Sequence, residues 1–286
     1  MLGYSETPVQ EIQDPIFVKA GVRVMIKRED LNHAFICGNK WWKLKYNLEE
    51  AVKLGYTTLL TFGGAYSNHI YSTAAAAQEL GLKSIGVIRG EETLPLNNVL
   101  SFAKSKGMQL HYVSRERYRS KTEEAFTKKL HDTWGSFYLI PEGGTNDLAV
   151  KGVTEFAQML GNDFDYLCCA VGTGGTMAGL ISGLPSEKKL IGFPVLKNGE
   201  FLRAEIEKLL QRKHTNWLLN SEYHFGGYAK TTPQLTSFIE DFHTKHQIQL
   251  DPVYTGKALS GVIDLISRNT FTKGSTILFI HTGGVH

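Results

Sequence analysis

The sequence predicts an α/β protein built on open, twisted, mostly parallel sheets that are flanked by helices. Short β-branched and apolar runs alternate with longer segments of helical periodicity along the whole chain, and this alternation is typical of parallel sheets covered on both faces. Glycine-rich segments follow four of the expected strands, after Phe62, Ile140, Val171 and His281. Because ligands bind at the carboxyl ends of strands in such folds, we expect these segments to belong to one site.

Each element is assigned from its own pattern, a β-branched or apolar run for a strand and a 3.6-residue apolar repeat for a helix. In the first half, strands are expected at 22–28, 57–62, 83–88, 109–113 and 137–140. Helices are expected at 40–54, from 69 to about 80, and at 96–106, 115–131 and 147–160. In the second half, strands are expected at 166–171, 190–195 and 276–281, and helices from about 177 and at 199–213, 234–245 and 257–268.

Length and charge limit the class of protein. The chain has 286 residues, which suggests two domains or one large one, and 42% of them are hydrophobic. Lys and Arg number 31 against 28 Asp and Glu, and a net charge of +3 is too small to indicate a nucleic-acid partner. The densest basic patch, Arg115, Arg117, Arg119 and Lys121, alternates with glutamates and is interpreted as a solvated helix face.

Cysteine usage and hydropathy favour a soluble, cytoplasmic protein. No apolar run reaches the length of a membrane span, and the acidic first residues lack the apolar core of a signal peptide. Cys37, Cys168 and Cys169 lack metal-ligand spacing, and the last two lie in an apolar run that indicates core packing. His243 and His246 have no third ligand nearby in the sequence, so we expect no metal site.

Lys40 is the first candidate catalytic residue. Gly38 and Asn39 lead into it, and a helical apolar pattern follows it. A cation in the first turn of a helix faces the positive end of the helix dipole, so an amine that is neutral or covalently engaged fits better there. The alternative is a solvated lysine that opens an amphipathic helix.

A glycine-rich loop between a strand and a helix predicts a phosphate site. It consists of Gly172, Thr173, Gly174, Gly175 and Thr176. Its backbone N–H groups, its hydroxyls and the start of the helix suit an anion. The loop lacks the Gly-Lys-Ser/Thr of a P-loop, and Met177 stands where a dinucleotide fingerprint needs its third glycine. The pattern therefore favours a phosphorylated cofactor, with an ordinary glycine-rich turn as the alternative.

Two further segments suggest a substrate pocket. Ser67, Asn68 and His69 follow a strand and open a helix, where free N–H groups suit a carboxylate, although Ser and Asn are also ordinary N-caps. Tyr254 precedes another helix and is expected to point into a cleft, and Tyr228, after two glycines, is a weaker candidate of the same kind. The alternative for both tyrosines is that they anchor turns.

Taken together, the motifs resemble one family. They are, in order, KREDLNHAFICGNKWWKLKYN, FGGAYSNH, PEGGTN, VGTGGTMAG, DPVYTGK and HTGG. This series resembles the 1-aminocyclopropane-1-carboxylate deaminase / D-cysteine desulfhydrase family, a branch of the fold type II pyridoxal-phosphate enzymes that are similar to the tryptophan synthase β subunit. The resemblance extends from about residue 27 to 284. It implies two open, twisted sheets, a large cofactor-binding domain of residues 1–42 and 137–286, a small inserted domain of residues 43–136, and a homodimer.

The resemblance also implies the cofactor, pyridoxal 5'-phosphate, and the residues around it. Lys40 looks like the lysine that forms the Schiff base, and the loop from Gly172 to Thr176 looks like the phosphate cup. Asn68 looks like the partner of the phenolic oxygen, and Thr255 occupies the position next to the pyridine nitrogen.

The same resemblance implies a pocket for a small amino-acid substrate. Ser67 looks like the residue that holds the substrate carboxylate and handles a proton, with Asn68 and His69 beside it. The remaining residues expected to face the substrate are Tyr66, Tyr228 and Tyr254.

Three departures from the family pattern shape the functional hypothesis. Deaminases have a glutamate where Thr255 stands, and a neutral hydroxyl makes the cofactor ring a weaker electron sink, which suffices for β-elimination. Tyr66 replaces a common glutamine and is expected to make the pocket bulkier. The chain also ends at Val285-His286, short of the usual tail, which is expected to alter the floor of the cofactor site.

The sequence therefore predicts a pyridoxal-phosphate-dependent lyase or deaminase. We favour a D-cysteine desulfhydrase that forms pyruvate, ammonia and sulfide. The alternatives are a 1-aminocyclopropane-1-carboxylate deaminase that forms 2-oxobutanoate and ammonia, a cofactor-binding homologue with little turnover and, as an outside choice, a nucleotide-dependent oxidoreductase.

Overall fold

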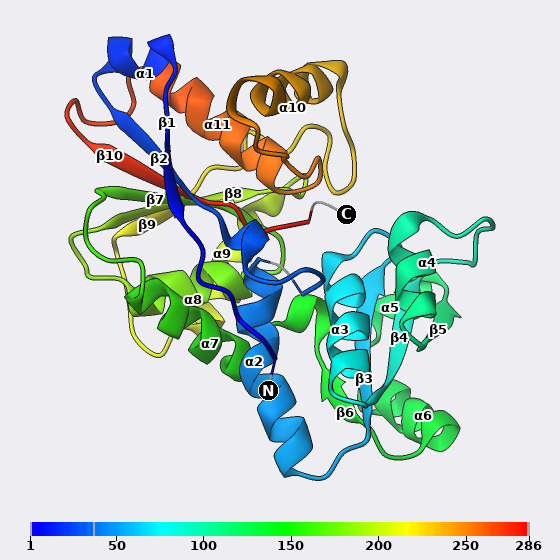
Figure 1. The fold of residues 1–286 in the computed structure, drawn as a ribbon. Coiled ribbons are helices and arrows are strands. Elements are labelled where there is room, and N and C mark those ends of the chain that lie inside the picture. The colour runs from blue at the N-terminus through cyan, green and yellow to red at the C-terminus, as the bar shows by residue number, and fades with distance from the viewer. Residues whose placement is uncertain (1, 37, 285–286) are drawn as a thin grey trace.

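The computed structural model describes residues 2–36 and 38–284, so Cys37 and the terminal Val285-His286 lie outside the described residues. Two sheets stand side by side, a six-stranded sheet of order β1-β2-β10-β7-β8-β9 and a four-stranded sheet of order β5-β4-β3-β6 (Figure 1). This arrangement confirms the α/β class with two mostly parallel sheets.

The six-stranded sheet is parallel except at one edge. Its strands are β1 (Val9–Ile12), β2 (Arg23–Lys27), β7 (Tyr166–Val171), β8 (Lys189–Pro194), β9 (Trp217–Leu219) and β10 (Thr276–Ile280). Only β1 pairs antiparallel, with Val9 opposite Lys27 on β2. β10 lies between β2 and β7, so the last strand of the chain occupies the middle of the sheet.

Helices cover both faces of the six-stranded sheet (Figure 1). Those of the large domain are α1 (Pro15–Ala20), α2 (Asn39–Lys53), α7 (Asp147–Gln158), α8 (Gly175–Gly183), α9 (Leu202–Leu209), α10 (Pro233–His246) and α11 (Thr255–Ser267). Successive side chains of β10 point to opposite faces, so Leu278 packs in the cluster with α2, α7 and α8 while Phe279 packs with α1, α10 and α11.

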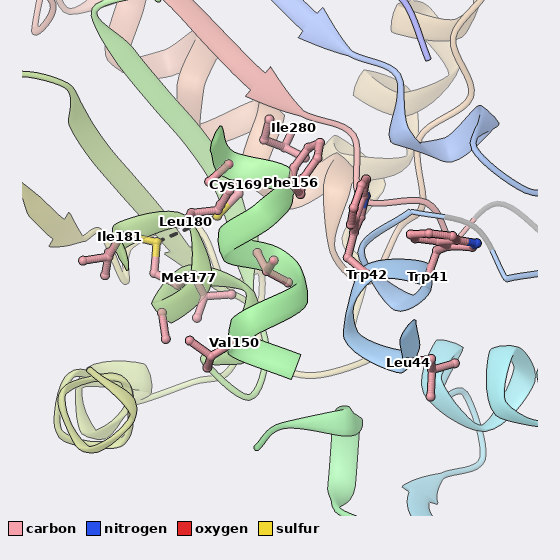
Figure 2. Close-up of a cluster of buried hydrophobic side chains, with 14 of the residues drawn as sticks. Trp41, Trp42, Leu44, Val150, Phe156, Cys169, Met177, Leu180, Ile181 and Ile280 are labelled. Carbon is pink, nitrogen blue, oxygen red and sulfur yellow. Dashed lines mark hydrogen bonds between the residues drawn. The ribbon is translucent and has the colours of Figure 1, made fainter. Parts of the chain in front are cut away.

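The cluster on the first face holds the beginning of α2 in place. Trp42 of α2, Phe156 of α7 and Met177 of α8 meet there, and Cys169 of β7 lies against Met177 (Figure 2). Cys168 faces the other cluster, so both cysteines belong to the core, as the sequence predicts.

The four-stranded sheet is wholly parallel. Its strands are β3 (Thr58–Gly64), β4 (Lys83–Arg89), β5 (Met108–Val113) and β6 (Tyr138–Ile140). α3 (Asn68–Glu79) and α4 (Asn98–Ser105) pack on one face, and α5 (Arg115–Arg119) and α6 (Glu124–Trp134) pack on the other. Short 3-10 turns lie at Glu29–Leu31, Glu142–Gly144 and Gly199–Phe201.

Several elements differ from the expected ones. The helix expected at 115–131 is interrupted after Arg119, where Ser120 ends α5 and the side chain of Lys121 turns to Glu142, 3.2 Å from its carboxylate. The helix expected at 199–213 is a 3-10 turn followed by α9, which ends at Leu209. The sequence pattern did not predict β1, α1 or β9.

Sheet membership places the small domain differently from the expected boundaries at 43 and 136. β6 pairs with β3 of the small sheet, whereas α2 packs against α7 of the large domain. We therefore propose a small domain of about residues 54–140. Among the described residues, no helix is long and apolar enough to cross a bilayer.

Candidate active site

A cleft of about 520 Å³ lies where the carboxyl ends of both sheets meet. Its volume is in the range of small-molecule sites. It is lined by the start of α2, the turn between β3 and α3, the loop between β7 and α8, and two tyrosines of the large domain. The segments that the sequence analysis singled out thus converge on one cavity.

The start of α2 is fixed by Gly38. This glycine has φ +70°, and a Cβ atom there would lie 1.9 Å from the backbone oxygen of Thr282, so a side chain is excluded on both grounds. Two residues later, Lys40 lines the cleft, and its Nζ donates to Asn39 Oδ1 at 3.0 Å. Asn39 Nδ2 in turn donates to Thr176 Oγ1 at 2.7 Å, which ties the lysine to the glycine-rich loop.

The glycine-rich loop, the candidate anion site, lines the cleft. Gly172, Thr173, Gly174 and Thr176 line it, while Gly175 is buried behind them. The first turn of α8 contains no acidic residue, so its free N–H groups keep their positive potential.

Lys43 lies on the same face of α2 as Lys40, one turn later. Its buried Nζ donates to the backbone oxygen of Gly143 and, at 2.9 Å, to Thr145 Oγ1. The amine also lies 3.2 Å from the position that a Cβ atom would take at Gly175. Burial and, second, the nearby Lys40 hold the pKa of Lys43 well below its usual value.

Lys43 forms no ion pair with a carboxylate in the described part of the chain, and burial favours the neutral form of its amine unless an anion enters beside it. Lys43 is therefore a candidate for the anion site, where a bound phosphate would favour the charged amine. It was not expected from the sequence, although its spacing of three residues from Lys40 was a readable signal.

The turn before α3 brings Ser67, Asn68 and His69 into the cleft. Ser67 is the N-cap and accepts from the N–H of Ile70 at 3.4 Å. His69 is buried, and its Nε2 lies 2.7 Å from Thr61 Oγ1.

The tautomer of His69 follows from its partner. The Thr61 hydroxyl donates to the backbone oxygen of Ile140, so it must accept from His69 Nε2–H. Nδ1 is then an acceptor, and it has no partner among the described residues. Burial first, and then Lys43 and Lys40, lower the pKa of His69 well below its usual value, which keeps the ring neutral.

Tyr228 and Tyr254 both line the cleft, with ring centroids 6.1 Å apart in an edge-on arrangement. The Tyr254 ring lies against the loop, because a Cβ atom at Gly172 would be 3.1 Å from its Cε1. Burial raises the pKa of both hydroxyls, so both remain protonated donors at neutral pH.

Besides Gly175, two expected site residues, Thr255 and Tyr66, do not line the cleft. Thr255 is fully buried, and its Oγ1 accepts from the N–H of Asp251 at 2.8 Å. Tyr66 is 55% exposed and lies outside the lining residues, so it does not fill the pocket as its bulk had suggested. Thr282, which the sequence analysis did not single out, does line the cleft.

Charged residues of the small domain were also missed. Arg89, Lys121 and Glu142 line the cleft, although Lys121 had been interpreted as part of a solvated helix face. Their positions depend on where β4 ends, where α5 stops and how the chain turns after β6, and no short motif encodes these features.

Comparisons with known proteins identify the relatives of this chain. A family model described as pyridoxal-phosphate dependent enzyme matches residues 1–283. A Pyrococcus horikoshii protein provisionally named 1-aminocyclopropane-1-carboxylate deaminase is 36% identical over 298 residues, which cover 98% of this chain and 90% of the relative. The bifunctional D-cysteine desulfhydrase/1-aminocyclopropane-1-carboxylate deaminase, mitochondrial, of Arabidopsis thaliana is 32% identical over 311 residues, which cover 99% and 77% of the two chains.

Solved structures give the same fold. The crystal structure of an ACC deaminase homologue superimposes with a TM-score of 0.85 at 34% identity and covers 100% of this chain and 91% of the other. A hydrogen sulfide-producing enzyme from Fusobacterium nucleatum has a TM-score of 0.69 at 17% identity, with 98% and 96% covered. The second likeness supports the fold alone.

Proposed function

Because the chain belongs to the pyridoxal-phosphate dependent enzymes, we propose that it catalyses β-elimination from a small amino acid, with D-cysteine as the favoured substrate. The cofactor is pyridoxal 5'-phosphate. One observation carries the proposal. Lys40, the glycine-rich loop before α8 and the turn before α3 that is expected to bind a carboxylate all line one cleft.

The residues present fit this cofactor. The Lys40 side chain lines the cleft, and we assign its amine to the reaction with the aldehyde; Asn68 lines the same cavity, and we assign it to the phenolic oxygen. The phosphate has the N–H groups of the loop from Gly172 to Thr176 and the buried amine of Lys43, whose position without an acid partner is otherwise unexplained.

When bound, pyridoxal phosphate withdraws electrons from the substrate Cα and makes its proton acidic. We assign the acceptance of that proton to the Lys40 amine. Ser67 and the free N–H groups of the first turn of α3 hold the substrate carboxylate. Tyr254 and Tyr228, both protonated, are the donors placed to deliver a proton to the departing β-substituent.

One observation favours elimination over opening of a cyclopropane ring. Thr255 and Thr282, the hydroxyl residues of the DPVYT and HTGG segments, are neutral. A neutral residue beside the cofactor ring makes that ring a weaker electron sink than a carboxylate would. Of the two, we propose that Thr282 faces the cofactor, because it lines the cleft and Thr255 does not. A deaminase acting on 1-aminocyclopropane-1-carboxylate is the second candidate, supported by the names of the relatives.

The proposal extends to the state of the protein in the cell. We propose a cytoplasmic homodimer, in keeping with the family resemblance and with the buried, free thiols of Cys168 and Cys169. Light scattering behind a sizing column should give a mass of twice 31.9 kDa.

One panel of substrates tests the function. Cofactor-loaded protein is incubated with both enantiomers of cysteine and serine and with 1-aminocyclopropane-1-carboxylate, and ammonia, sulfide and 2-oxo acids are measured. We expect equal amounts of sulfide and pyruvate from D-cysteine. Faster 2-oxobutanoate formation would favour the second candidate, and a yellow protein inert toward the whole panel would reject both.

A further inference from the structure

Arg89 is a positively charged residue of the cleft that we have assigned neither to the cofactor nor to the α-carboxylate of the substrate. It is the last residue of β4, its side chain is exposed, and it lines the cavity. The guanidinium carbon lies 5.7 Å from the centroid of the Tyr118 ring and 5.9 Å from that of Tyr228. No carboxylate among the described residues pairs with it, so its N–H donors remain available.

The guanidinium has aromatic neighbours but no carboxylate partner among the described residues. The Tyr118 and Tyr228 rings lie near it, and its Nη2 lies 3.4 Å from the position of a Cβ atom at Gly64. A planar, oriented fork of donors is what bidentate recognition of a carboxylate, sulfonate or phosphate requires.

Arg89 lies on the substrate side of the cleft. Gly64 is the last residue of β3, directly before the turn that leads into α3, and its backbone oxygen accepts from the N–H of Ser67 at 3.0 Å. Tyr228, the other neighbour, faces Tyr254. The partners of Lys43 are different residues, next to the glycine-rich loop, so Arg89 is not part of the phosphate site.

The other charges of the cleft balance one another. Lys121 pairs with Glu142 at 3.2 Å, and Glu205 accepts from Lys208 at 2.7 Å. Once Lys40 and Lys43 are assigned to the cofactor, Arg89 is the remaining positive charge without a carboxylate partner among the described lining residues.

We propose that Arg89 binds an anionic group on the β-substituent of the substrate, so that amino acids with a β-sulfonate or β-phosphate leaving group are substrates besides D-cysteine, whereas aspartate, which has no such leaving group, binds as a ligand. This inference rests on the proposed elimination and specifies its substrate class. With a β-phosphate, the Cα–H and Cβ–O bonds break, the electron pair leaves with the phosphate oxygen, and one water is consumed, giving pyruvate, ammonia and phosphate. With a β-sulfonate, the pair leaves with sulfur as sulfite.

Binding is tested with an isosteric pair of ligands. Aspartate and asparagine, as both enantiomers, are titrated into cofactor-loaded protein, and the dissociation constant is read from the change in cofactor absorbance. We expect one enantiomer of aspartate to bind about 10- to 100-fold more tightly than the matching asparagine. In Arg89→Gln this preference should disappear, in Arg89→Lys it should be partly retained, and in Arg119→Gln, an exposed arginine outside the cleft, it should be unchanged.

Elimination is tested on the same proteins with O-phosphoserine and the sulfonate analogue of cysteine against O-acetylserine and cysteine. Wild type should favour O-phosphoserine over the neutral O-acetylserine, whose leaving atom is also oxygen, in kcat/KM, and Arg89→Gln should lose about 10- to 100-fold on the anionic substrates alone. If Arg89→Gln weakens all ligands equally and lowers the melting temperature, the arginine is a structural link between Tyr118 and Tyr228 and the inference is wrong. Activity on neutral substrates without any anionic preference rejects the inference and leaves the proposed function standing, whereas no elimination from any substrate rejects the function itself.

Discussion

At the scale of single residues, we assign different roles to Lys40 and Lys43, two lysines that the sequence alone does not distinguish. Both lie on one face of α2 and both line the cleft, but only Lys43 is fully buried against Gly143 and Thr145. The position of Lys40 suits an amine that reacts with an aldehyde and accepts a proton. The position of Lys43 suits an amine that binds a phosphate held in one place.

For Lys40 we predict loss of both the covalent link and the reaction. Lys40→Ala should lower elimination by about 10³-fold or more, because the proton acceptor is removed. Borohydride treatment followed by peptide mapping should place the cofactor on residue 40 in the wild type and nowhere in the variant. Lys45→Ala, on the same helix and paired with Glu155, is the control and should behave like the wild type. Full activity of Lys40→Ala would contradict the assignment.

For Lys43 we predict a loss specific to the phosphate. Lys43→Gln should weaken binding of pyridoxal 5'-phosphate about 10- to 100-fold, because a charge-assisted hydrogen bond is lost. Binding of pyridoxal, which lacks the phosphate, should change little. Equilibrium titration followed by absorbance gives both constants, and Lys45→Gln serves as the control. Equal weakening of both ligands would mean that Lys43 only supports the local structure.

The residues of short motifs could be predicted from the sequence as candidates for the cleft. The charged residues of the small domain that line the cleft could not. Lys40, the glycine-rich loop and Ser67 to His69 were found because helix starts after strands have a local signature. Arg89 and Lys121 belong to the cleft only because of the rings and carboxylate that other segments bring near them. Thr255 occupies the position that the family resemblance places next to the pyridine nitrogen, but its Oγ1 accepts from the backbone N–H of Asp251.

At the scale of elements, the contact between α2 and α7 sets the position of Lys40, the lysine that we propose as catalytic. The two helices approach so closely at Gly152 that a Cβ atom there would lie 2.0 Å from the backbone oxygen of Trp42. Trp42 itself is anchored by its indole N–H, which donates to Glu29 at 2.7 Å.

We predict that Gly152→Ala destabilises the protein by at least about 2 kcal/mol, because the added methyl group meets backbone that cannot turn aside. Since α2 must move, the affinity for the cofactor should fall as well. Urea unfolding and cofactor titration measure the two effects. Gly3→Ala, where nothing lies within 4 Å of the added carbon, is the control. A Gly152→Ala protein as stable as wild type would show that the two helices separate at little cost.

Strong periodic segments were predictable as elements, and short polar ones were not. β7 and β10 are continuous apolar runs that are buried on both faces, and such runs predict central parallel strands. β1 has only four residues, two of them polar, and forms because β2 offers it an edge. The break between α5 and α6 likewise depends on Tyr118 being buried and Lys121 reaching Glu142.

At the scale of the whole molecule, the free energy of unfolding depends on groups buried near the cleft. Asp251 is 4% exposed, and its Oδ1 accepts from the N–H of Tyr254 at 2.5 Å. Burial raises its pKa to about 7, although hydrogen bonds from the backbone and the nearby Lys40 oppose this rise.

The sign of the pH effect follows from this shift. Between the ordinary value of 3.8 and about 7, the folded protein holds a proton that the unfolded chain releases, so Asp251 lowers stability as the pH rises through this window. Asp251→Asn removes the titration and keeps the oxygen acceptor. Relative to wild type, this variant should gain up to about 4 kcal/mol between pH 4 and pH 7.5, measured by urea unfolding with saturating cofactor at each pH. A difference between the two proteins that does not change with pH would contradict the prediction.

The strand order also dictates when each half of the protein can be completed during its synthesis. The small sheet comes from one continuous stretch, β3 to β6, and can close as soon as that stretch has left the ribosome. The larger sheet must wait, because its central strand β10 is translated after every other strand, and Thr282 just beyond it supports the start of α2. A nascent chain in which β10 has not yet been made therefore carries the strands of the small sheet beside an incomplete larger sheet, and we expect it to capture its vitamin-derived cofactor only after β10 has been made.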